Sequence, residues 1–205
     1  DSYSVEYAEI VSAGNVTLNT QQEVTNFAQT GISAIDGNLA IGTHRSDDPV
    51  KNLKGLEHLV SVGNNFTIGA AYAGETLSGR DAGLSNLKEV RGNITLSEEN
   101  TSLKGFSLPS LTSATGDITL VSNTLETVEM PALGRVGGTL EVRSDALILT
   151  TADLLAQIDG DLILSGSTAK TAVAPCDYFY FPELRSVTGK LSLSYFGNLS
   201  NTGII

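Results

Sequence analysis

The strongest constraint in this sequence is a short unit that recurs eight times along the chain. One copy, residues 133–142, reads Leu-Gly-Arg-Val-Gly-Gly-Thr-Leu-Glu-Val. In each copy a short apolar segment is followed by a glycine corner and then by an apolar-x-apolar triplet. The corner glycines are Gly14, Gly37, Gly63, Gly92, Gly116, Gly138, Gly160 and Gly189, so the period drifts between 22 and 29 residues. Such a period is typical of solenoids, in which one coil stacks on the next.

The corner glycines and the triplets together predict how each coil is built. A glycine here indicates either a positive φ angle or a close approach of neighbouring backbones, because a Cβ atom would obstruct both. In a triplet such as Ile94-Thr95-Leu96, the outer two side chains share one face, since strand side chains alternate with period two. We expect that face to point inward, where stacked coils bury it. The expected outward column is Thr17, Ala40, Thr67, Thr95, Thr119, Glu141, Ile163 and Ser192.

These patterns predict one mainly β domain over residues 1–205: a right-handed parallel β-solenoid of about eight coils. The run Thr20-Gln21-Gln22-Glu23 has the form of a capping box, and it predicts a short helix over 20–28 that caps the open end. Insertions at 42–49 and 69–83 predict irregular surface loops. Residues 151–155 fit either a one-turn helix or the next coil.

Charge and composition exclude several classes of partner. The net charge is −11 and the twelve Lys and Arg residues are scattered, which argues against nucleic acid and anionic membranes as partners. No apolar run reaches the length of a membrane span, so we expect membrane attachment only through a lipid anchor outside this sequence. Cys176 is the only cysteine, and we expect a buried free thiol rather than a disulfide or a metal ligand.

The sequence predicts no catalytic residue, no metal site and no cofactor. The only histidines are His44 and His58, which form no recognisable pair, and Asp47-Asp48 lacks the spaced acidic residues of a calcium loop. The best enzyme alternative is a polysaccharide-active β-helix, which needs titratable side chains on adjacent coils. The outward column holds one carboxylate, Glu141, and no cation. Acid–base catalysis needs at least two such groups within reach, so we expect a protein that is not an enzyme.

Asparagine also recurs at the corners. Five Asn-x-Ser/Thr sequons occur, at Asn15, Asn65, Asn93, Asn100 and Asn198. In a eukaryotic secreted chain they would predict glycans. Three of them, Asn15, Asn65 and Asn93, follow from a corner asparagine ahead of a strand with an outward threonine, which favours repeat geometry as their origin.

The repeat resembles a known family. The unit at residues 53–68, with Leu-x-Gly-Leu-x-x-Leu-x-x-Val ahead of the corner, is similar to the receptor L-domain repeat. That family includes the ligand-binding lobes of insulin and epidermal growth factor receptors, fungal cell-wall proteins and surface lipoproteins of Bacteroidetes-type bacteria. Residues 16–27 are most similar to how the bacterial members begin. The resemblance covers nearly the whole chain. It implies an extracellular module that belongs to an outer-membrane lipoprotein of a bacterium.

The chain also departs from that family. It lacks the paired cysteines of the receptors, so no receptor ligand site is carried over. It lacks the asparagine that follows the strand in the common leucine-rich repeat. We therefore expect a flat β-helix rather than a horseshoe with an asparagine ladder.

The resemblance and the loops together favour a non-enzymatic cell-surface or adhesion module that binds a protein or glycan partner, with a structural cell-envelope spacer as the alternative. Binding is expected on the inserted loops, because packing fixes the coils. In the aromatic run 178–181, Phe179 and Phe181 are expected to pack inward, unless the whole run only seals the last coils. The candidate binding residues are Tyr178 and Tyr180 first, then Tyr72, His44 and Arg45.

Overall fold

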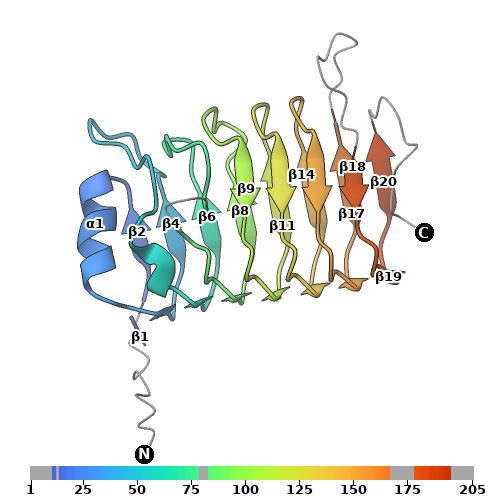
Figure 1. Ribbon diagram of the computed structural model, residues 1–205, viewed down its shortest axis with the longest axis horizontal. Coiled ribbons are helices and arrows are strands. Elements are labelled where there is room, and N and C mark those ends of the chain that lie inside the picture. The colour runs from blue at the N-terminus through green and yellow to red at the C-terminus, as the bar shows by residue number, and fades with distance from the viewer. Residues whose placement is uncertain (1–10, 13, 79–82, 167–177, 195–205) are drawn as a thin grey trace, which may run out of the picture.

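A computed structural model describes residues 11–12, 14–78, 83–166 and 178–194. The chain forms a parallel β-solenoid with one short helix near the N-terminus, which confirms the predicted fold class. The solenoid has about six turns, where the sequence predicted about eight coils. The coils lie side by side along the long axis of the molecule, from α1 at one end to β20 at the other (Figure 1).

Two eight-stranded sheets and one four-stranded sheet, all parallel, make up the described coils. The short-strand sheet precedes the corners and consists of β1 (Val11–Ser12), β3 (Ala34–Ile35), β5 (Ser61–Val62), β7 (Glu89–Val90), β10 (Ser113–Ala114), β13 (Arg135–Val136), β16 (Gln157–Ile158) and β19 (Ser186–Val187). The triplet sheet follows the corners and consists of β2 (Val16–Leu18), β4 (Leu39–Ile41), β6 (Phe66–Ile68), β8 (Ile94–Leu96), β11 (Ile118–Val121), β14 (Leu140–Arg143), β17 (Leu162–Ser165) and β20 (Leu191–Ser194). The four-stranded sheet consists of β9 (Gly105–Ser107), β12 (Thr127–Glu129), β15 (Leu149–Thr151) and β18 (Tyr178–Tyr180).

The triplet sheet has the register that the repeat predicts. Its paired middle residues run without a break from Thr17 through Thr95 to Ser192, so the expected outward column is confirmed. The inward neighbours are buried: Ile94 and Leu96 are 0% and 2% exposed. One continuous apolar core therefore runs through the coils.

The N-terminal helix α1 (Gln21–Gln29) begins at the predicted capping box. Thr20 Oγ1 accepts from the Glu23 backbone N at 3.0 Å, and the Glu23 carboxylate accepts from the Thr20 backbone N at 3.0 Å. Val24 is fully buried, so the helix covers the end of the core (Figure 1). This confirms the predicted cap. A 3-10 helix, η1 (Leu56–His58), packs against α1.

The run 151–155 is the next coil and not a helix. Thr151 ends β15, and the Ala152 backbone N donates to Tyr180 O at 3.1 Å on the following coil. Of the two alternatives that the sequence left open, the structure supports the coil.

Close approach, rather than positive φ, explains most of the corner glycines. Among them Gly14 has a φ of 95°, whereas the other seven lie outside the left-handed region. A Cβ on Gly116 would stand 2.8 Å from the Gly92 carbonyl oxygen and closer still to Asn93 Oδ1. A Cβ on Gly160 would stand 2.7 Å from Gly138 C. The preceding coil therefore occupies the space that a side chain would need.

The third coil departs from the predicted alignment by one position. Gly63 is the first of its three corner residues, and the Asn64 backbone N donates to Gly37 O at 3.1 Å. Asn64 therefore occupies the position that glycine holds in the neighbouring coils. The prediction that Gly63 is equivalent to the other corner glycines is wrong.

An Asx ladder runs along the corners, at the residue just before each triplet strand. The Oδ1 atom of Asn15 accepts from the Asn38 backbone N at 2.9 Å, and the same contact repeats coil by coil as far as Asp161 and Lys190. In one coil the acceptor is the Thr139 hydroxyl oxygen instead of an Asn or Asp side-chain oxygen. The expected β-helix is confirmed. Its ladder lies before the triplet strand, whereas the asparagine that the sequence lacks is one that would follow the strand.

The sequon asparagines occupy two different environments. Asn15, Asn65 and Asn93 belong to the ladder, as repeat geometry predicts. Asn100 is 1% exposed, and its Nδ2 donates to Gly69 O and Tyr72 O at 2.9 Å each. In the folded chain this amide is therefore not accessible to modification. Asn198, like Cys176, lies outside the described residues.

Replacing Gly116 by alanine tests the close approach at the corners. We expect Gly116→Ala to lower the free energy of unfolding by about 2 kcal/mol or more, because the new methyl would push two coils apart. Gly134→Ala is the matched control, since its Cβ would meet only Thr112 O, at 3.8 Å. The free energy of unfolding of Gly134→Ala should stay within roughly 0.5 kcal/mol of the wild-type value. Urea unfolding measures both, and equal effects would contradict the packing argument.

Thr150 tests the cost of an unpaired hydroxyl in the core. It lies between Val128 and Phe179 in the inward column of the four-stranded sheet, is fully buried, and its Oγ1 has no hydrogen-bond partner. Thr150→Val should raise the free energy of unfolding by about 1 kcal/mol, because it removes an unsatisfied polar group. Thr124→Val should instead lower it, because Thr124 Oγ1 donates to Leu103 O at 3.0 Å. Urea unfolding of both variants is the measurement, and destabilisation by Thr150→Val would contradict the prediction.

Candidate functional site

The predicted aromatic run is partly confirmed. Phe179 and Phe181 are each 1% exposed, so they pack inward as expected. Tyr180 is half-buried at the end of β18. Tyr178 belongs to the same strand and pairs with Leu149, but the direction of its side chain lies outside what the structure describes. This run lines one edge of the four-stranded sheet.

Tyr72 is a core residue, so the prediction that it offers its ring to a ligand is wrong. Its side chain is 0% exposed, and its hydroxyl donates to Thr76 O at 2.6 Å. Burial raises the pKa of the Tyr72 phenol well above its usual value. The ring fills the interior beneath the second insertion, where periodicity in the sequence gives no signal.

His44 and Arg45 are exposed on the loop that follows β4. The His44 backbone N donates to Asn19 Oδ1 at 3.0 Å, which ties this loop to the coil before α1. The loop therefore lies near the helical end of the solenoid, whereas β18, the strand that ends at Tyr180, lies near the other end (Figure 1). The structure does not bring these predicted binding residues together.

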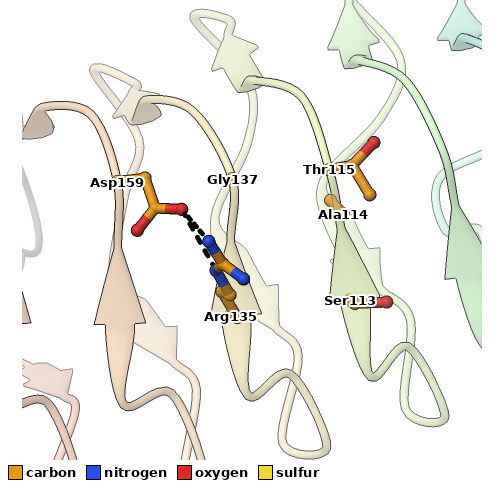
Figure 2. Close-up of a pocket in the computed structure, with 6 residues that line it drawn as sticks. All are labelled: Ser113, Ala114, Thr115, Arg135, Gly137 and Asp159. Atoms are coloured by element: carbon orange, nitrogen blue, oxygen red, sulfur yellow. Dashed lines mark hydrogen bonds and ion pairs between the residues drawn. The ribbon is translucent and has the colours of Figure 1, made fainter.

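A shallow depression with a polar lining lies on the short-strand sheet. Its volume is about 360 Å³. We call it the polar groove, and it is lined by Ser113, Ala114, Thr115, Arg135, Gly137 and Asp159 (Figure 2). These residues come from three successive coils, since Ser113 pairs with Arg135 and Arg135 with Gln157.

The groove exists because one corner position has no side chain. Thr115, Gly137 and Asp159 each follow a paired inward residue of the short-strand sheet. A Cβ on Gly137 would stand 2.9 Å from Thr115 C, and nearer to its carbonyl oxygen, so that position is closed to a larger residue. A gap is thereby left between the threonine and the aspartate. The same coil packing that fixes the fold opens this depression.

An ion pair lies at one edge of the groove. Arg135 Nε lies 3.1 Å from Asp159 Oδ2, and Arg135 Nη2 bonds to the same oxygen (Figure 2). Gln157 Nε2 donates to Asp159 Oδ1 at 2.5 Å. The Arg135 guanidinium and then the Gln157 amide hold the pKa of the Asp159 carboxyl below its usual value. The arginine side chain is 60% exposed and the aspartate 23%, so the pair is held in place yet accessible.

Sequence reasoning missed this pair because the two residues are 24 positions apart. Only the triplet column was aligned across the coils. The same alignment applied to the residues before each corner would have placed Arg135 and Asp159 on neighbouring coils. The signal was therefore present in the repeat.

A second, smaller depression lies where the triplet strands end. It has a volume of about 230 Å³ and is lined by Val121, Ser122, Asn123, Arg143, Ser144, Asp145, Ser165 and Gly166. Arg143 Nε lies 2.6 Å from Glu141 Oε1, so the one carboxylate of the outward column has a cation beside it on the same strand. The predicted outward column of the triplet sheet is correct, but Arg143 lies outside that column.

Comparison with known proteins identifies no relative. No protein-family model matches the chain, and neither a curated protein nor a solved structure matches it. Within the described ranges, no three His, Cys, Asp or Glu side chains gather closely enough to hold a metal ion. No helix in those ranges is both long and apolar enough to cross a membrane.

The pKa of Asp159 tests the ion pair. Arg135→Ala should raise that pKa toward its usual value, because the cation that favours the charged carboxylate is gone. The wild-type pKa is depressed, so the stabilisation by this pair is present above the usual carboxyl pKa and is lost as pH falls through the depressed value. NMR titration of the aspartate carboxyl carbons measures it. Arg91→Ala, on the Glu89 pair two coils before Arg135, should leave the pKa of Asp159 unchanged.

Proposed function

We propose that this protein is a non-enzymatic binding module that recognises a protein or glycan partner on a rigid solenoid scaffold. The observation that carries the proposal is the polar groove, where Ser113, Arg135 and Asp159 from three coils surround one depression. Groups fixed on strands lose little conformational freedom on binding, which favours recognition by a preformed surface. The groove thus replaces the inserted loops as our first candidate for the contact surface, with His44 and Arg45 as exposed loop candidates.

The arrangement of charges supports binding rather than catalysis. Glu89 and Glu141 lie on the outer faces of the two long sheets and Asp159 lies just after β16, and each has an arginine within 3.2 Å. The Arg135 guanidinium lowers the pKa of Asp159 and so favours its charged form, whereas a general acid must hold a proton near working pH. These pairs serve well as fixed donors and acceptors for a ligand.

The cellular setting is proposed from the family resemblance. The repeat at residues 53–68 and the opening at 16–27 resemble receptor L-domains and bacterial surface lipoproteins. We propose an exported protein at the cell surface, with any membrane attachment through a lipid anchor. The acidic balance of the chain, −11, is compatible with this setting.

A structural spacer of the cell envelope is the second candidate. The observation that favours it is the uniform stacking of the two eight-stranded sheets, which gives a stiff rod independently of any ligand. A spacer needs no groove, so the two functions respond differently to Arg135 substitutions.

The binding function is tested on an immobilised panel of glycans and extracellular-matrix proteins. We expect the intact chain to bind at least one member, and Arg135→Ala to weaken that binding at least tenfold, about 1.4 kcal/mol. Arg91→Ala is the matched control, because it removes a similarly exposed arginine that follows β7 of the same sheet and does not line the groove. If no member is retained, the spacer function is favoured. If Arg135→Ala binds like the wild type, the binding surface lies outside the groove.

A further inference from the structure

From the chemistry of the polar groove, we infer that its ligand is an uncharged glycan, recognised through neighbouring hydroxyl groups of its sugar rings. This inference rests on the proposed binding function and names its ligand class. Three features of the groove support it: hydrogen-bonding groups that keep unused capacity, the local charge, and the kinds of side chain that line the groove.

The groove offers donors and acceptors side by side. Two guanidinium nitrogens of Arg135 bond to Asp159, and the opposite edge of the guanidinium turns toward the side where Ser113 lies (Figure 2). A guanidinium has five N–H groups and a carboxylate about four lone-pair sites, so both keep capacity for a ligand. Thr115 Oγ1 donates to Arg91 O at 2.6 Å, on the side away from Arg135, so it is not counted among the ligand-binding groups (Figure 2). A sugar hydroxyl can accept from the arginine while it donates to the aspartate.

Charge decides between an uncharged and an anionic sugar. Asp159 offsets the positive charge of Arg135 within the groove, so no net cation is available for a carboxylate, sulfate or phosphate. The whole chain carries −11, which repels a polyanion as it approaches. A bidentate salt bridge to a uronic acid would have to displace the existing pair. Uncharged hydroxyls need no such displacement.

The lining of the groove disfavours a protein partner. Its described residues include no aromatic and no large apolar side chain, and Arg135 is the only residue of a type that often dominates protein interfaces. The volume of about 360 Å³ lies at the lower end of the range for small-molecule sites, roughly 300–1,000 Å³. A few sugar rings suit this shape better than a protein surface.

The groove is continued by polar residues along the solenoid axis. The outward column of the short-strand sheet includes Ser61, Glu89, Ser113, Arg135, Gln157 and Ser186, in register from coil to coil. Neighbouring strands are spaced by about 4.8 Å, so these groups form an evenly spaced polar track. A glycan that enters the groove can extend along this track, and longer oligosaccharides should bind more tightly than monosaccharides.

The test is an NMR titration of the intact, ¹⁵N-labelled chain with three probes: uncharged gluco- and manno-oligosaccharides, oligogalacturonate, and the monosaccharides glucose and mannose. We expect an uncharged oligosaccharide to shift the backbone amides of Ala114, Thr115 and Gly137. Arg135→Ala and Arg135→Lys should each weaken this binding at least tenfold, because lysine keeps the charge but loses the planar fork. Arg91→Ala should bind like the wild type, and circular dichroism should show every variant folded.

Each outcome separates the ligand class from the binding function. Tighter binding of oligogalacturonate overturns the uncharged class and leaves a binding function in place. Shifts elsewhere, or unchanged affinity in Arg135→Ala, overturn the groove as the glycan site. If no sugar binds while a panel protein is retained in an Arg135-dependent way, the glycan inference fails and the binding function stands. If neither probe set binds, both proposals fail.

Discussion

The close approach of neighbouring coils at the corners is the constraint on which this structure depends. At Gly116 and Gly138 a Cβ atom would stand within 3.0 Å of the preceding coil's backbone, so the corner backbones are in direct contact. That proximity also lets each ladder side chain reach the next coil's backbone N, at 2.7 Å from Asp117 to Thr139 for example. Every coil is thereby locked to its neighbour at one point. The strands on both sides of that point must then pair in register.

The register of the paired strands explains how the apolar core is built and how it is closed at its ends. Once the corners align, inward residues stack in columns, and a middle residue such as Leu162 is fully buried. Leu191 occupies the equivalent position in the last described coil, yet it is 53% exposed, because a coil buries its inward face only against neighbours on both sides. At the other end α1 supplies that cover, with Val24 fully buried. Stability is therefore a property of neighbouring coils rather than of any single coil.

The repeat made the triplet sheet predictable because two regular signals coincide there, the corner glycine and the period of two. Thr17 and Ser192 could be placed in one column for that reason, and the capping box located α1. Other features lacked a repeating signal. Tyr72 lies in an irregular Gly- and Ala-rich insertion, where nothing in the local sequence distinguishes a buried ring from an exposed one. The sequence does not reveal the one-residue shift at Gly63, because two asparagines follow this glycine and either could serve as the corner residue.

The polar groove shows why a site on such a scaffold is hard to find from sequence and yet well defined in space. Its charged pair joins residues 24 positions apart, so no local motif contains it. Its shape comes from Gly137, which the preceding coil forbids from carrying a side chain. The gap is thus set by the same contact that holds the coils together, and it cannot close without separating them. Arg135 and Asp159 are fixed at its edge by strands that belong to the continuous sheet. A loop would have to order itself around a ligand, whereas this surface is already ordered by the fold.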